Sequence, residues 1–87
     1  MSGISSPGKI VVEKSYYTND IDESVADITY VGKQDETGKW FILKIDESGV
    51  TTECKYASQT NNATVEVYSV GWTNRVALTY GTYDEAF

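Results

Sequence analysis

Apolar and polar positions alternate through the middle of the chain in the manner of a β-strand. Over residues 50–57 (VTTECKYA), Val50, Cys54 and Tyr56 fall on one face and Glu53 falls on the other. A period of two sustained over this length is typical of a half-buried strand.

Two further runs predict strands that pair with this one. Residues 39–45 (KWFILKI) form a compact apolar run of strand length, and residues 28–34 (ITYVGKQ) form an earlier one. Each connection is short, acidic and ends in glycine: DETG at 35–38 and DESG at 46–49. Glycine adopts the positive φ of a tight turn readily, and we expect Gly49 to use this freedom in its turn. The sequence therefore predicts an antiparallel meander of three consecutive strands.

The remainder of the chain has weaker signals. Three further runs have the composition of strands: 63–70, 75–80 and, at a sheet edge, 9–17. The segment 19–26 carries early acidic residues and predicts one helical turn. The expected fold class is all-β, a small antiparallel meander or sandwich-like domain of five to six strands.

The length of 87 residues indicates one domain. Residues 1–8 are rich in Ser, Gly and Pro and predict an extended, flexible N-terminal arm, so the single β-domain is expected to span 9–87. A chain of this size buries a small core, and association with a partner is a common way for such a domain to gain stability.

Strand alternation also predicts which side chains are buried. We expect five residues to lose most of their exposure in the monomer: Trp40, Ile42, Cys54, Tyr56 and Leu78. Phe41, Leu43 and Ile45 then lie on the opposite face of the sheet. That face either packs against a second layer or forms an adhesive surface.

The charge balance excludes several classes of partner. Seven basic residues against thirteen acidic ones give a net charge of −6, and the basic residues are scattered singly. Nucleic-acid binding needs a clustered basic face, so no nucleic acid is expected. No apolar run approaches the ~20 residues of a membrane helix, and the first residues lack the features of a signal peptide. The sequence predicts a protein made in a cytoplasm that does not bind membranes.

Candidate catalytic chemistry is sparse. The chain has no histidine and a single cysteine, Cys54, which excludes histidine-based triads and Cys/His zinc sites. Adjacent carboxylates occur in pairs in turns or in the tail, where solvation explains them better than catalysis or calcium binding. We therefore expect no enzyme activity, no metal and no cofactor.

Aromatic residues make up 13% of the chain and suit half-buried faces and interfaces. Trp40, Phe41, Tyr56 and Trp72 are most simply assigned to the core. The residues expected at an interface lie near the two ends: Met1, Ile4, Pro7, Tyr16, Tyr17, Tyr83 and Phe87. Stacking of sugars on the exposed tyrosines is the alternative.

A second group of residues is expected to shape turns and core: Gly32, Gly38, Trp40, Gly49, Trp72, Asn74, Arg75 and Tyr80. In this group a guanidinium stacked on an indole, with an asparagine capping the turn, would hold the last strand against the sheet. This structural interpretation is favoured over a ligand site.

The order of these motifs resembles a group of short structural proteins of tailed bacteriophages. The similarity covers about residues 26–80, and WTNRVALTY at 72–80 is its most specific part. The positions that carry it are Tyr30, Gly32, Trp40, Ile42, Lys44, Gly49, Trp72, Asn74, Arg75, Leu78, Thr79 and Tyr80. The chain differs from the group at QDETG and at SQTNNATVEVYSV.

The resemblance implies a virion component. The role expected first is a capsid decoration or cement protein that binds the major capsid protein and itself, with its arm on a neighbouring chain. A tail, neck or fibre component is the alternative within the same biology. A small sugar- or peptide-binding β module is the alternative from another class.

Overall fold

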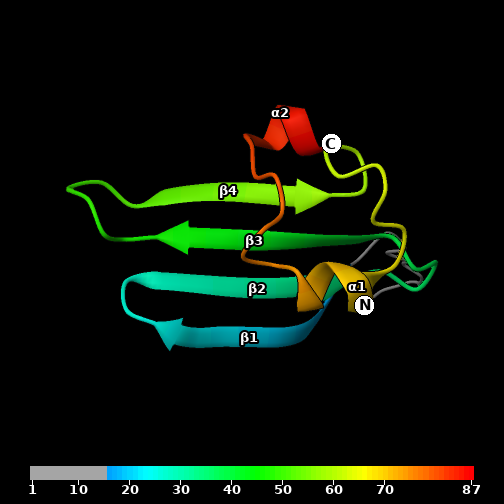
Figure 1. The fold of residues 1–87 in the computed structure, drawn as a ribbon, viewed down its shortest axis with the longest axis horizontal. Helices are drawn as coiled ribbons and strands as arrows, with labels where there is room; N and C mark the ends of the chain where they lie inside the picture. The colour runs from blue at the N-terminus through cyan, green and yellow to red at the C-terminus, as the bar shows by residue number, and fades with distance from the viewer. Residues whose placement is uncertain (1–15) are drawn as a thin grey trace, which may run out of the picture.

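The computed structural model describes residues 16–87, which form a four-stranded antiparallel sheet with two short helices (Figure 1). The elements are β1 (Tyr17–Val25), β2 (Ile28–Gln34), β3 (Trp40–Asp46), β4 (Glu53–Ser58), α1 (Tyr68–Thr73) and α2 (Tyr83–Ala86). The strands lie in the order β1-β2-β3-β4. The predicted meander of three consecutive strands is confirmed, and the protein is mostly β.

The pairing of the strands divides their side chains between two faces. Gly32 pairs with Ile42, and Val31 pairs with Leu43, so the two pairs point in opposite directions. One face, here called the covered face, carries Tyr30, Gly32, Trp40 and Ile42. The other, the open face, carries Ile21, Val31, Phe41, Leu43, Ile45, Cys54 and Tyr56.

The hydrophobic core lies on the covered face. Tyr30, Trp40, Ile42 and Tyr68 form its buried cluster, and Ile42 is fully buried. Trp72, Leu78 and Tyr80, together with Ile28 and Val65, pack around it. Figure 1 shows α1 in front of the sheet, so the segment after β4 supplies the second layer of this face.

After this layer the chain wraps around the β4 edge of the sheet. Gly81 exchanges two backbone hydrogen bonds with Tyr56, at 2.8 and 2.9 Å. Beyond Gly81 the chain enters α2, and Tyr83 at the start of this helix and Phe87 directly after it contact residues of the open face. The bridge also occupies backbone groups of an edge strand that would otherwise be unpaired.

The turn predictions hold in one case and fail in another. At 35–38, Gly38 has a φ of 97°, and the Asp35 carboxylate accepts backbone hydrogen bonds from Thr37 and Lys39. Gly49 does not take a positive φ, and it lies within the six-residue loop 47–52 that joins the paired ends of β3 and β4. In the β1–β2 turn it is Asp27 that takes a positive φ of 66°.

Three predicted elements have a different structure. The run expected as a strand at 63–70 is not a strand, and its last three residues begin α1, which continues to Thr73. Spacings of three and four place Tyr68, Gly71 and Trp72 on one helical face toward the sheet. Residues 75–80 form turns rather than a strand, with backbone bonds from Arg75 to Trp72 and from Ala77 to Asn74.

The helical turn expected at 19–26 is also wrong, since these residues belong to β1. The turn-like signal there corresponds to an irregularity in the strand, where the Ser24 N–H donates to the Asp22 carboxylate. The edge strand expected at 9–17 and the arm at 1–8 lie outside the described residues, apart from Tyr16 and Tyr17. The described residues contain four strands, not five or six.

Burial follows the predictions for Trp40 and Ile42, which are 3% and 0% exposed. Leu78 and Tyr56 are half-buried. Cys54 is exposed, contrary to the prediction. Its pairing with Ile45 directs it to the face opposite α1, where no other described segment covers it.

Candidate functional site

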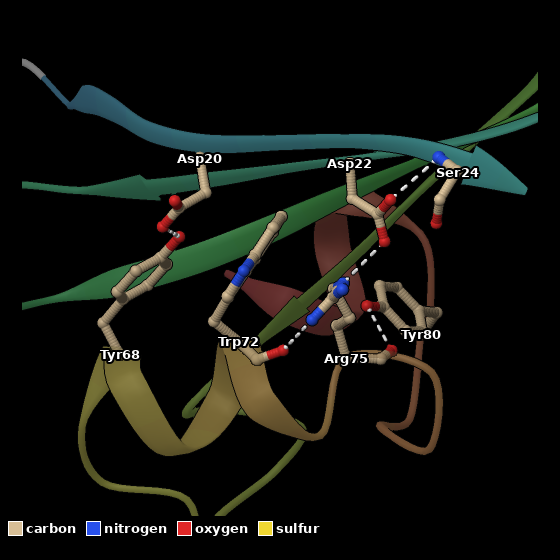
Figure 2. A network of polar contacts seen from close by, with 7 residues as sticks. All are labelled: Asp20, Asp22, Ser24, Tyr68, Trp72, Arg75 and Tyr80. Carbon is tan, nitrogen blue, oxygen red and sulfur yellow. Dashed lines mark hydrogen bonds and ion pairs between the residues drawn. The ribbon is translucent and has the colours of Figure 1, made fainter.

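The covered face is held to α1 and the segment after it by a polar network (Figure 2). The Tyr68 hydroxyl on α1 donates to the Asp20 carboxylate on β1 at 2.8 Å. The Arg75 guanidinium donates through Nε to the Asp22 carboxylate at 2.9 Å. Both carboxylates lie on one face of β1, two residues apart, so an edge strand provides two anchors for the second layer.

Arg75 connects three parts of this network. Its guanidinium lies over the Trp72 ring, 4.5 Å from the centroid, and donates through Nη1 to the Trp72 carbonyl at 2.7 Å. The Asn74 side-chain amide donates to the Val70 carbonyl at the end of α1. The expected stacking of guanidinium on indole is therefore present. It attaches α1 to β1 rather than a last strand to the sheet.

The ionisation of Asp22 reflects these contacts. The hydrogen bonds from Ser24, followed by that from Arg75, lower the pKa of the Asp22 carboxyl to about 2. Hydrogen bonds to the charged form of a carboxylate favour that form. Asp22 is therefore charged over the whole neutral range and remains a partner for Arg75.

The pKa values of the two tyrosines in the network, Tyr68 and Tyr80, are raised, whereas that of Asp22 is lowered. Burial raises the pKa of the Tyr80 hydroxyl, which donates to the Arg75 carbonyl at 2.7 Å. Burial, and then the hydrogen bond to Asp20, raises the pKa of Tyr68. Both hydroxyls are protonated at neutral pH and donate hydrogen bonds within the chain, so their role is structural. The polar groups of the network have partners within the chain, so the network attaches one layer to another rather than presenting groups to a ligand.

The open face is the part of the domain without a second layer of described residues. Val31, Leu43 and Ile45 are half-buried, Ile21 is 61% exposed, and Cys54 is exposed. Among the strand residues that the pairing assigns to this face, Lys33 carries the only charge. By contrast, the covered face carries Asp20, Asp22, Lys44, Asp46, Glu53 and Lys55.

Aromatic side chains build up one end of the open face. Phe41 lies at the centre, with ring centroids at 4.9 Å from Tyr16 and 5.2 Å from Phe87. Tyr56 contacts Tyr83 at 5.7 Å, and both meet Phe87. Tyr83 and Phe87 remain 62% and 47% exposed. These five aromatic side chains, here called the aromatic ridge, lie beside a floor of smaller apolar side chains, and Tyr56 of the ridge pairs with Leu43 of the floor.

The predicted interface residues are distributed unevenly around this surface. Tyr16, Tyr83 and Phe87 meet in the aromatic ridge. Tyr17 is exposed and pairs with Gln34, which places it toward the other face. Met1, Ile4 and Pro7 lie outside the described residues.

Several residues that shape both faces were not predicted from the sequence. Asp20, Asp22 and Tyr68 were not singled out, because their segments were assigned to other secondary structures. Ile21 was missed for the same reason. The alternation of Asp20, Ile21 and Asp22 is the pattern in the sequence that indicates a strand here, with the two acidic residues on one face and the isoleucine on the other.

A shallow hollow of about 250 Å³ lies near the ridge. Lys39, Trp40, Gln59 and Phe87 are among the residues that line it. The Trp40 indole N–H is buried and has no hydrogen-bond partner among residues 16–87. No Asp or Glu side chain among residues 16–87 lines the hollow. Within the described part of the chain, His, Cys, Asp and Glu form no group of three or more that would hold a metal ion.

Comparison of the chain with protein-family models, with curated proteins and with solved structures finds no match. Neither helix within residues 16–87 is long and apolar enough to cross a membrane.

Proposed function

We propose that the protein is a structural component of a bacteriophage virion without enzymatic activity, and that it binds other proteins through its open face. Within that role, a capsid decoration or cement protein is favoured. The order of the motifs at residues 26–80 supports the phage assignment. The observation that carries the binding role is the set of apolar side chains on the open face, where the paired strand residues include one charge, Lys33.

The apolar side chains of the open face matter energetically because the second layer of described residues packs on the other face of the sheet. The apolar side chains on the floor of the open face, Val31, Leu43 and Ile45, lose more water contact when a second layer covers them. Burial of apolar area contributes about 25 cal/mol per Å². Contiguous exposed apolar patches on small proteins commonly mark sites of protein association.

The experiment measures attachment to particles. Phage particles assembled without the protein are mixed with the purified chain, and bound protein is quantified after sedimentation. We expect saturable binding of the wild-type chain and at least about tenfold weaker binding of Leu43→Glu, since a buried unpaired charge is costly.

Val76→Glu is the matched control. Val76 is 74% exposed and follows α1, away from the open face, so the same charge is added elsewhere. We expect this variant to bind as the wild type does. Failure of the wild-type chain to bind particles, or equal binding by Leu43→Glu, contradicts the proposal.

A sugar- or peptide-binding module is the second candidate, and the aromatic ridge is the observation that favours it. Tyr83 and Phe87 present partly exposed rings of the kind that stack on sugars. A glycan or peptide array probed with the wild-type chain and with Tyr83→Ala distinguishes the two roles. Binding that is lost in Tyr83→Ala but kept in Leu43→Glu supports the module.

A further inference from the structure

We infer that residues 9–15 (KIVVEKS), here called the 9–15 segment, pack on the open face of their own chain and cover its floor of Val31, Leu43 and Ile45. The inference rests on the proposed role of this face in binding, and it adds a regulatory step. A virion partner then has to displace the segment before it reaches the floor.

The position of Tyr16 determines where the segment meets the domain. Tyr16 is half-buried, and its ring meets the Phe41 ring of the open face edge-on, with centroids 4.9 Å apart. Tyr16 also lines the hollow together with Ala86 and Phe87. The segment is therefore joined to a residue that already packs on the open face, so this face meets it at a high effective concentration.

The sequence of the segment has the alternation that such a contact needs. In an extended chain, side chains two residues apart point to the same side. Counting back from Tyr16 by twos gives Lys14, Val12 and Ile10. An extended segment therefore turns two β-branched aliphatic side chains toward the side on which Tyr16 packs, where they match the aliphatic floor. The alternate positions are mostly polar: Lys9, Val11, Glu13 and Ser15.

The length of the segment matches the distance that it has to cover. Along β3, Ile45 lies four residues beyond Phe41, which is about 13 Å at the rise of a strand. Val12 and Ile10 lie four and six residues before Tyr16, so an extended chain carries them about 13 and 20 Å from it. Both therefore reach the rows of the sheet beyond Phe41, where the floor lies.

Charge also favours this occupant. The segment contains two lysines and one glutamate, and without them the totals of seven basic and thirteen acidic residues leave residues 16–87 with five and twelve, a net charge of −7. Acidic side chains border the open face: Glu23 is exposed in the irregular part of β1, and Asp84 and Glu85 are exposed on α2. These carboxylates attract a segment of net charge +1.

The reactivity of Cys54 tests the cover. Cys54 is the one cysteine of the chain, lies on the open face and is exposed. Under native conditions we expect its thiol in the full chain to be alkylated at least about tenfold more slowly than in a peptide of residues 50–57. Val12→Glu should raise the rate at least about fivefold, since a charge opposes burial of the segment. The rate should not depend on protein concentration, because the occupant belongs to the same chain.

Val76→Glu is the matched control, because it makes the same substitution at an exposed position away from the open face. Its Cys54 should react as slowly as that of the wild type. Equal rates in the wild type, in Val12→Glu and in the peptide overturn the inference. Protection that increases with protein concentration also overturns it, because another chain is then the cover.

Nuclear Overhauser contacts in the isotope-labelled full chain test the placement directly. We expect contacts from the methyl groups of Ile10 and Val12 to those of Leu43 and Ile45. A spectrum in which residues 9–15 show no contact with the open face overturns the inference.

Particle binding separates the inference from the proposed function. When both hold, Val12→Glu should bind particles at least about threefold more tightly than the wild type, because a larger fraction of its open face is uncovered. A protected Cys54 in a chain that does not bind particles would leave the inference standing and refute the proposed function. Particle binding by a chain with an unprotected Cys54 would do the reverse.

Discussion

Gly32 lies directly beneath the phenol ring of Tyr68, so that a methyl group at Gly32 would overlap the Tyr68 hydroxyl. Because Gly32 of β2 has no side chain, the Tyr68 ring can lie across this strand and reach Asp20 on β1. A backbone position in the middle of a strand therefore determines how α1 is attached.

Gly32→Ala should lower the free energy of unfolding by about 1–3 kcal/mol, because the added methyl group displaces a packed ring. Gly49→Ala is the matched control, since the nearest atom to its methyl group is the Thr51 carbonyl oxygen at 3.9 Å. The control should change stability by no more than about 0.5 kcal/mol. Urea unfolding followed by tryptophan fluorescence measures both, and equal effects of the two substitutions would contradict this account.

Arg75→Lys should destabilise the domain by about 1–3 kcal/mol, although it preserves the charge. Lysine lacks the planar guanidinium that stacks on Trp72 while donating to Asp22 and to the Trp72 carbonyl. Lys55→Met serves as the control, because Lys55 meets Glu53 at 4.0 Å on the exposed surface. In an Asp22→Asn background the effect of Arg75→Lys should shrink. An undiminished effect there would show that the two residues are not coupled.

The stability of the domain should fall in acid. The pKa of Asp22 is lowered to about 2 in the folded protein, first by the hydrogen bonds from Ser24 and then by Arg75. A carboxylate with a lowered folded pKa stabilises the fold at pH values above its ordinary pKa near 4. That contribution is lost as the pH falls from about 4 to 2. Denaturant midpoints measured across this window should be less pH-dependent in Asp22→Asn, and a parallel dependence would contradict the assignment.

The domain should also lose stability in alkali. The pKa values of Tyr68 and Tyr80 are raised, mainly by burial, so both hydroxyls bind their protons more tightly in the folded state. Their contribution is complete below the ordinary pKa near 10 and is lost as the pH rises above it. Tyr80→Phe removes the hydrogen bond to the Arg75 carbonyl. It should be less stable at neutral pH and less sensitive to alkali, as measured by tyrosinate absorbance and thermal unfolding.

The amino-acid sequence determined the β2–β3–β4 meander, because its signals are local. Alternation with a period of two specifies a strand and its two faces, and the DETG turn contains the Asp35 acceptor and the Gly38 backbone conformation that the turn uses. The burial of Trp40 and Ile42 was predictable for the same reason, because it follows from the local alternation of side chains along β3.

The chain beyond β4 acquires its structure only from tertiary packing. Residues 63–70 have the composition of a strand, yet 68–73 become a helix. The helix lies so close to the sheet that a methyl group at Gly71 would come within 3.2 Å of the Trp40 indole. Packing against the sheet outweighs a weak local preference here.

The side of the sheet that α1 covers is likewise a tertiary result. Alternation shows that Ile42 and Leu43 point in opposite directions, but it does not show which of them meets the second layer. The contacts of α1 and of the segment after it with Asp20, Asp22 and Trp40 settle that choice. Cys54 is exposed for the same physical reason, because the six-residue helix α1 packs on the face opposite to Cys54.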